Sequence, residues 1–152
     1  MARNYYSEIN LHFTWHTKSS SPLLTSSVEA VVHHYLRGRC INTAGVYIHE
    51  IGGTETHVHL AVTIPPTLLI SEWVGQLKGS SSHEANQKMG HKVLEWQVGY
   101  GVVSFGTKDL DWVTKYVKNQ KEHHADGKIQ DRLERIEFVE PPYAQAEPRE
   151  AP

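Results

Sequence analysis

Residues 53–63 of this chain, GTETHVHLAVT, contain the pattern that decides the fold. From His57 onward every second residue is apolar, which is the period of a half-buried β-strand. His57 and His59 therefore lie on the same face of that strand. Same-face neighbours have Cα atoms roughly 6.5 to 7 Å apart, so their imidazoles can converge on one metal ion. The alternative interpretation is that the two histidines form only the polar face of a strand.

The length and composition indicate a single domain in a reducing compartment. The chain has 152 residues, of which 39% are hydrophobic, and one cysteine, Cys40. A single cysteine forms no internal disulfide and fits the cytoplasm. Residues 1–8 contain no apolar run for a signal peptide, and no segment approaches the roughly 18 apolar residues of a membrane span. We therefore expect a cytoplasmic protein that does not contact membranes.

Charge is distributed unevenly along the chain. The net charge is −2, which argues against a strongly basic nucleic-acid binder. Residues 1–121 hold 11 Lys and Arg against 9 Asp and Glu, whereas residues 122–152 hold 4 against 8. A mildly basic body with an acidic tail is compatible with a nucleic-acid partner but does not require one.

Hydrophobic periodicity predicts the order β-α-β-β-α-β-α. Strands are expected at residues 6–17, 46–51, 57–64 and 97–105, and helices at residues 27–41, 69–87 and 107–123. The first six elements are those of the split β-α-β arrangement, a four-stranded antiparallel sheet with helices packed on one face. The fold class is therefore α+β, with an additional helix near the C-terminus. Residues 1–127 form the predicted domain, and residues 128–152 form an acidic, Pro-containing tail that we expect to be partly disordered.

The last predicted helix supplies further candidate site residues. Trp112, Tyr116 and Gln120 are spaced four apart, on a face offset from the apolar Val113 and Val117. A phenol and a carboxamide one turn apart can address the same ion or phosphate. The alternative is an amphipathic surface helix whose tyrosine covers its neighbours.

Four short motifs follow one another along the predicted domain. They are His57-Val58-His59 after a Gly-Gly turn, residues 76–82 (QLKGSSS), residues 99–101 (GYG) and residues 116–124 (YVKNQKEHH). In this order and spacing they resemble the insertion-sequence 200-like transposases, the single-tyrosine members of the HUH (His-hydrophobe-His) single-strand nucleases. The resemblance covers about residues 5–124. It implies a dimeric enzyme that cuts and rejoins single-stranded DNA at hairpin ends.

The resemblance also implies roles for individual residues. His57, His59 and Gln120 would bind a divalent ion, Mg²⁺ or Mn²⁺, at the scissile phosphate. Tyr116 would attack the phosphorus and remain joined to the 5′ end as a phosphotyrosine, while a 3′-hydroxyl leaves. A phenol attacks poorly at its usual pKa near 10 unless a metal neutralises the developing charge. Imidazole ligands favour Mn²⁺ over Mg²⁺, so Mn²⁺ should support activity at least as well.

One position departs from the family pattern, and several polar residues have open roles. The family commonly has an acidic residue directly before the first histidine, where this chain has Thr56, which puts the tuning around the metal in doubt. Possible DNA contacts near the proposed site are Lys78, Trp112, Lys115, Lys118 and Lys121. His12 and His16 are expected to face solvent, and His123 and His124 need no catalytic role at a helix end.

Two other functions compete with transposition. The first is a domesticated protein that binds hairpin DNA with weak or lost chemistry, which the intact His57, His59, Tyr116 and Gln120 argue against. The second is an unrelated His-x-His metal hydrolase, which would need more ligands and would not need Tyr116. A homodimer is expected because the face of Trp112, Tyr116 and Gln120 lies off its own core stripe and could complete a partner's site.

Overall fold

The fold is built on a four-stranded antiparallel sheet, as the sequence predicts. The structure is a computed structural model that describes residues 4–138 and 140. The strands are β1 (Ile9–His16), β2 (Tyr47–Gly53), β3 (His57–Ile64) and β4 (Gly101–Phe105), in the spatial order β2-β3-β1-β4. The neighbouring strands are antiparallel, and β3 pairs with both β1 and β2. The His-x-His strand is therefore central in the sheet, which fixes its two histidines in a rigid frame.

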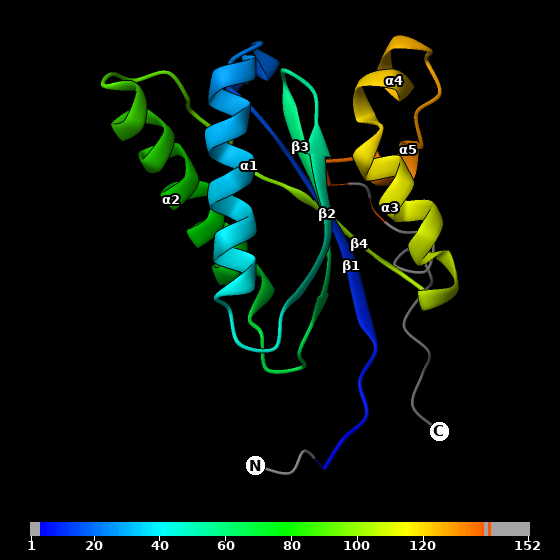
Figure 1. Cartoon of the computed structure of the whole chain (residues 1–152). Coiled ribbons are helices and arrows are strands. Elements are labelled where there is room, and N and C mark those ends of the chain that lie inside the picture. The colour runs from blue at the N-terminus through cyan, green and yellow to red at the C-terminus, as the bar shows by residue number, and fades with distance from the viewer. Residues whose placement is uncertain (1–3, 139, 141–152) are drawn as a thin grey trace.

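Helices cover both faces of this sheet (Figure 1). Helices α1 (Ser26–Ile41) and α2 (Ile70–Met89) lie on one face, as expected for the split β-α-β arrangement. Helices α3 (Leu110–Lys118), α4 (Gln120–Ala125) and α5 (Asp131–Glu134) lie over the other face. Short 3-10 turns, η1 (Lys18–Ser20) and η2 (Thr107–Asp109), follow β1 and precede α3. None of the helices among the described residues is long and apolar enough to cross a membrane.

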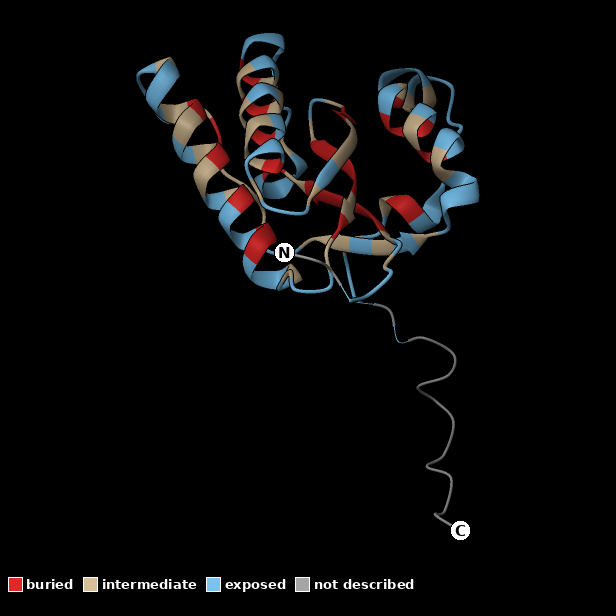
Figure 2. Cartoon of the chain, turned by 60° about the horizontal axis from the view of Figure 1, so that its bottom comes forward, coloured by how far each residue is buried: buried red, intermediate tan, exposed pale blue. Residues whose placement is uncertain are grey.

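The main core lies between the sheet and helices α1 and α2 (Figure 2). Phe13 and Trp15 of β1 are fully buried there, beside apolar residues of β3 and of both helices. Helix α2 continues through its three serines, whose hydroxyls bond to carbonyls of the preceding turn, because buried residues on both sides of them pack into the core. Three strands differ from expectation: β1 begins at Ile9 rather than residue 6, β4 begins at Gly101 rather than residue 97, and β2 extends through the predicted Gly52-Gly53 turn.

The opposite face of the sheet carries the polar side chains of β1 and β3, yet it is buried. His12 and His59 are 1% and 0% exposed beneath α3, α4 and α5. The expectation that His12 faces solvent is therefore wrong, because the period of a strand assigns residues to faces but does not say what covers each face. His16 is half-buried and its ring stacks on that of His57, with centroids 4.7 Å apart.

Part of the predicted tail returns to the sheet. Helix α5 contacts β1 and β4, and Leu133 is buried there. The chain passes so close to the sheet that a Cβ on Gly101 would overlap the carbonyl oxygen of Arg135. Glycine at position 101 therefore allows α5 to approach. The division of the chain at residue 127 stays a prediction, and the expected disorder falls mainly on residues 139 and 141–152, which lie outside the described residues.

Candidate active site

His57 and His59 project from β3 with their Nε2 atoms directed toward a shared position. Their ring centroids are 4.9 Å apart. The Nδ1 atom of His57 lies 3.0 Å from the hydroxyl oxygens of both Thr54 and Thr56. The Nδ1 atom of His59 lies 2.7 Å from Nε2 of His12. Each ring is thus held through Nδ1, which leaves Nε2 for a ligand.

Two further residues complete a cluster that we call the histidine–glutamate group: His57, His59, His124 and Glu134. One potential ligand atom from each residue lies within 4.8 Å of the others. Nε2 of His124 is 3.2 Å from Nε2 of His57. The Glu134 carboxylate lies 3.2 Å from His59 Nε2 and 3.4 Å from His57 Nε2. His124 was expected to need no catalytic role and Glu134 was not among the predicted site residues, so both are additions to the site.

The histidine–glutamate group has the chemistry of a divalent metal site. Three imidazoles and a carboxylate are common ligands for Mn²⁺ and Zn²⁺. His59 Nε2 is buried and makes no hydrogen bond of acceptable geometry, despite its 3.2 Å approach to Glu134. A buried nitrogen without such a bond is costly unless another ligand satisfies it. The residues present therefore fit the divalent ion that the sequence motif implies.

Burial and hydrogen bonding set the charges of this group. Burial lowers the pKa of His59, which favours the neutral ring that a metal requires. Burial alone would raise the pKa of Glu134, but the adjacent His57 and His59 rings and the hydrogen bond from the Tyr116 phenol hold that pKa well below its usual range. Glu134 is therefore an anion beside the imidazoles and can act as an oxygen ligand of a divalent ion.

Tyr116 of α3 reaches the same group. Its phenol donates a hydrogen bond to Oε1 of Glu134 at 2.5 Å and accepts one from the Gln130 main-chain N–H at 2.9 Å. The Tyr116 ring centroid lies 6.0 Å from that of His59. Burial is the main reason that the pKa of Tyr116 rises to about 12. The phenol is therefore neutral near pH 7 and its oxygen is fixed beside the histidine–glutamate group.

Gln120 meets the group indirectly. The predicted third helix breaks at Asn119, so Gln120 starts α4 instead of continuing α3. Its amide nitrogen donates to the Tyr116 carbonyl at 3.1 Å, and its amide oxygen lies 3.0 Å from Nε2 of His124. Gln120 is fully buried. The structure thus brings Gln120 to the site, with His124 between it and the other members.

A close packing contact sets the distance between the tyrosine helix and the histidine strand. Gly52 of β2 pairs with His59 of β3. A Cβ on Gly52 would overlap the carbonyl oxygen of Val117, the residue that follows Tyr116. Glycine at position 52 therefore lets the end of α3 rest directly on the sheet beside the site.

The predicted DNA contacts divide into two sets. In the first set, Trp112 is 50% exposed and stacks on Tyr116 with ring planes inclined by 21°. Lys115 and Lys118 of α3 and Lys121 of α4 are exposed on the same side of the sheet. Lys78 lies on α2, on the other face of the sheet. Its ammonium donates to the carbonyls of Gln97 and Gly99, each at 2.7 Å, so the structure does not bring it to the site.

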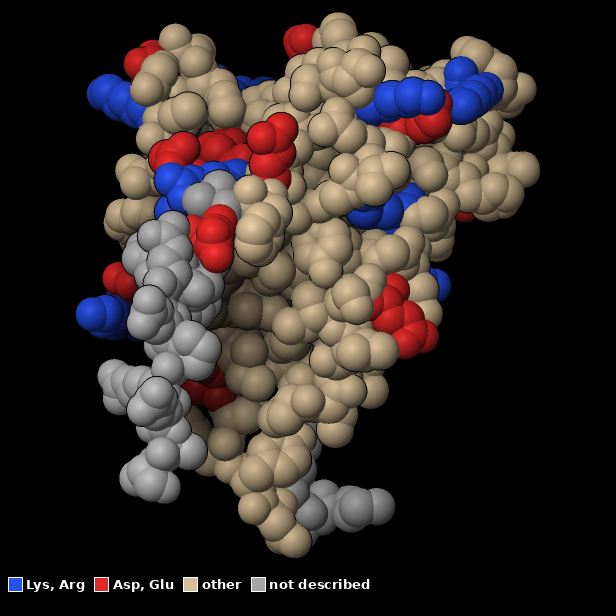
Figure 3. Space-filling model, turned by 180° about the vertical axis from the view of Figure 1, so that it is seen from behind, with Lys and Arg blue, Asp and Glu red and all other residues tan. Residues whose placement is uncertain are grey.

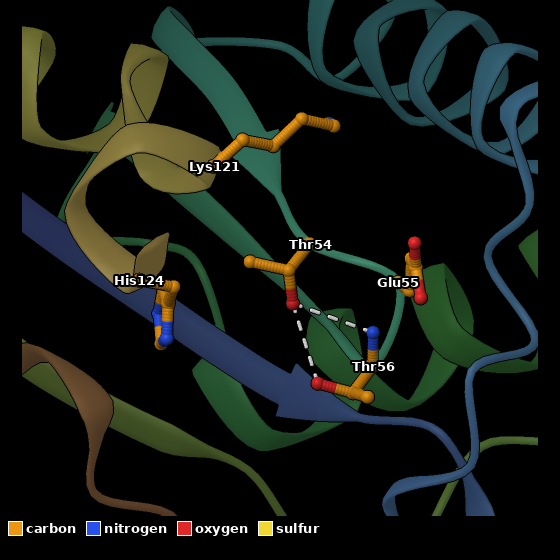
Figure 4. A pocket seen from close by; sticks show the side chains of 5 residues that line it. All are labelled: Thr54, Glu55, Thr56, Lys121 and His124. Atoms are coloured by element: carbon orange, nitrogen blue, oxygen red, sulfur yellow. Dashed lines mark hydrogen bonds between the residues drawn. The ribbon is translucent and has the colours of Figure 1, made fainter. Parts of the chain in front are cut away.

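A hollow of about 350 Å³ opens beside the group (Figure 4). Thr54, Glu55 and Thr56 of the β2–β3 turn form one side, and Lys121 and His124 of α4 form the other. His124 belongs to both the hollow and the histidine–glutamate group, so the hollow adjoins the site. On the face presented in Figure 3, acidic and basic side chains lie close together, in keeping with the small net charge.

Comparisons with known proteins place this chain in the class of DNA transposases. A family model described as "Transposase IS200 like" matches residues 5–120. The chain belongs to the IS200-like transposase family, whose members cleave and transfer DNA. A search of curated proteins gave no match.

Two solved structures share the fold. A candidate transposase from Deinococcus radiodurans has a TM-score of 0.56 and 18% identity, covering 79% of this chain and 96% of the other. A REP-associated tyrosine transposase bound to a REP hairpin also has a TM-score of 0.56, with 20% identity over 85% of this chain and 75% of the other. At this identity the likeness supports the fold only.

Proposed function

We propose that the protein cleaves and rejoins single-stranded DNA with Tyr116 as the nucleophile. The observation that carries this proposal is the position of the Tyr116 phenol, which hydrogen-bonds to a carboxylate within a group of three histidines. The Tyr116 oxygen forms a bond to phosphorus as the bond between phosphorus and the 3′-oxygen breaks. The 3′-oxygen leaves as a hydroxyl and the 5′ end stays on Tyr116. Because the phosphodiester energy is kept, rejoining needs no nucleotide cofactor.

The protein would act with a divalent ion, Mg²⁺ or Mn²⁺. We infer that His57, His59 and Glu134 hold the ion directly and that His124 lies beside them. Gln120 is the further ligand that the family resemblance suggests. The bound ion would polarise the phosphoryl oxygens and offset the charge that develops during attack. Carboxylate oxygen suits both Mg²⁺ and Mn²⁺, while imidazole favours Mn²⁺.

The chain's own residues place the nucleophile. Tyr116 is neutral near pH 7, so its proton must leave as it attacks, and the Glu134 oxygen at 2.5 Å is the nearest acceptor in the described structure. The proton passes on to solvent, which restores the Glu134 anion, and solvent supplies the proton of the leaving 3′-hydroxyl. The Gln130 N–H fixes the phenol oxygen from a second direction. Such positioning lowers the barrier because the reacting oxygen needs no further ordering.

The substrate that fits this site is a flexible single strand with hairpin ends. Trp112 offers an exposed aromatic surface on which a base can stack beside Tyr116. Lys115 and Lys118 can bind its phosphates, whereas Lys121 is paired with Glu29 at 2.8 Å and must exchange that partner to do so. A solved REP-associated tyrosine transposase that shares this fold is bound to a REP hairpin, which supports the same class of DNA here.

We propose that the site forms within a single chain. Tyr116 and His59 come from α3 and β3 of one polypeptide, and Tyr116 is only 4% exposed. In this arrangement the face of Tyr116 and Gln120 packs against its own chain, and a site shared between two chains stays the alternative prediction. The homodimer itself stays a prediction.

A cleavage assay tests the proposal. End-labelled single-stranded hairpin DNA incubated with the protein and Mn²⁺ should give a fragment with a free 3′-hydroxyl, and Tyr116→Phe should bind DNA without cleaving it. Cleavage by Tyr116→Phe with a 5′-phosphate product would support the metal hydrolase instead. Binding without cleavage by the wild type would support a domesticated DNA-binding protein.

A further inference from the structure

We propose that His12 is a positioning residue that fixes the proton of His59 on Nδ1, so that the lone pair of Nε2 is free for a divalent ion. This inference rests on the metal site proposed above and deepens it. It concerns a residue of β1 that lies outside the His-x-His motif. His12 is 1% exposed, and its Nε2 atom lies 2.7 Å from Nδ1 of His59.

The sheet register explains why these two rings meet. His12 pairs directly with Ala61 of β3, and His59 is two residues from Ala61 on the same face. Diagonal neighbours across an antiparallel pair lie within reach of long or aromatic side chains. The small Ala61 side chain leaves room for the His12 ring to lean toward His59, and their centroids are 4.9 Å apart.

The proton between the two rings has only one placement that is compatible with metal binding. A neutral imidazole carries one N–H and one lone pair, so a short N···N contact needs one ring to donate and the other to accept. If His12 donated, the proton of His59 would sit on Nε2 and point at the ion. If His59 donates from Nδ1, its Nε2 lone pair faces the histidine–glutamate group. Metal binding therefore requires His12 to accept.

The other motif histidine shows the same design with different residues. Nδ1 of His57 is held by the hydroxyls of Thr54 and Thr56. Hydroxyls accept as readily as they donate, so they permit the same tautomer. Both ligand rings are thus anchored behind Nδ1, one by the turn and one by the neighbouring strand. A partner that orients a ligand in this way typically contributes 10- to 100-fold in metal affinity.

Two substitutions separate hydrogen bonding from packing at this position. His12→Gln retains an oxygen acceptor near the place of Nε2, whereas His12→Leu fills the space without any acceptor. We expect His12→Leu to weaken Mn²⁺ binding about 10- to 100-fold and His12→Gln to restore most of the loss. Calorimetric titration of each folded variant with Mn²⁺ measures this. Equal affinities in the two variants would overturn the role of His12.

Nitrogen-15 spectra of the Zn²⁺-loaded protein give a readout independent of activity. Zn²⁺ serves as a diamagnetic probe of the same ligands. We expect His12 as the Nδ1–H tautomer and a hydrogen-bond coupling from His59 Nδ1–H to His12 Nε2. A proton on Nε2 of His12 in the loaded protein would overturn the inference. Failure of the wild type to bind either metal would overturn the metal site and this role together. Metal binding by the wild type, with equal Mn²⁺ affinities in His12→Leu and His12→Gln, would overturn only the role of His12.

Discussion

Gly52 of β2 lies directly against the main-chain carbonyl of Val117, with no room for a side chain between the sheet and the end of α3. This contact joins the two halves of the site, because Gly52 pairs with His59 and Val117 follows Tyr116. The separation of the nucleophile from the histidines is therefore set by backbone packing rather than by the site residues themselves.

Replacing Gly52 by alanine should force α3 away from the sheet. Overpacking of this kind costs about 1–3 kcal/mol of unfolding free energy, and we also expect weaker Mn²⁺ binding as Glu134 moves with Tyr116. Urea unfolding and calorimetry measure the two effects. The matched control is Gly79→Ala in α2, where a Cβ would meet nothing within 4 Å. The control should be neutral or stabilising by about 0.4–1 kcal/mol. Similar behaviour of both variants would refute the packing role.

Removing the charge of Glu134 tests the proposed ligand set. Glu134→Gln should reduce Mn²⁺ affinity at least about tenfold, because a neutral amide replaces the only carboxylate among the four members of the group. Gln120→Ala should have a smaller effect if Gln120 acts through His124. Glu137→Gln, at an exposed position three residues along, is the control for charge alone. A larger loss in Gln120→Ala than in Glu134→Gln would instead favour the ligand set implied by the family.

The sheet and its histidines could be predicted from the sequence because their signal is local. The alternation of apolar and polar residues along β1 and β3 predicted both strands, and it placed His57 and His59 on one face. The four-residue spacing of Tyr116 and Gln120 predicted that both lie near one site, and they do so although the helix breaks at Asn119.

The remaining site residues depend on contacts between distant segments. Glu134 lies in a short charged stretch with no periodic signal, and only the passage of the chain over Gly101 brings it to the histidines. The place of His12 beside His59 depends on the register between β1 and β3, which the sequence does not reveal. His124 had a usable signal, since it stands one turn after Gln120, but a histidine at a helix end has an ordinary explanation in the helix dipole.

Cys40 should be inert in the folded protein. It lies near the end of α1 and is fully buried in the core, and burial raises the pKa of its thiol to about 12. Ellman's reagent at pH 8 should therefore label almost none of the native protein and one thiol per chain in urea. Rapid labelling under native conditions would show that the core between α1 and the sheet opens readily.

Mixing two inactive variants tests whether each site belongs to one chain. Tyr116→Phe lacks the nucleophile and His57→Ala lacks a proposed ligand, and a site formed within one chain cannot be repaired by combining them. We expect no recovery of cleavage, with subunit exchange or dimer formation checked by sedimentation. Recovery of a substantial part of the wild-type activity would show that Tyr116 of one chain works with the histidines of another.

The covalent product on Tyr116 tests the central claim most directly. After incubation with Mn²⁺ and single-stranded hairpin DNA, nuclease and trypsin digestion should yield residues 116–118, YVK, carrying a nucleotide through its 5′ phosphate. Mass spectrometry should find this peptide in the wild type and in Tyr47→Phe, the same change at an exposed tyrosine away from the site, and should not find it in Tyr116→Phe. DNA cleaved by the wild type without any modified peptide, or with the nucleotide on another residue, would contradict the assignment of Tyr116 as the nucleophile.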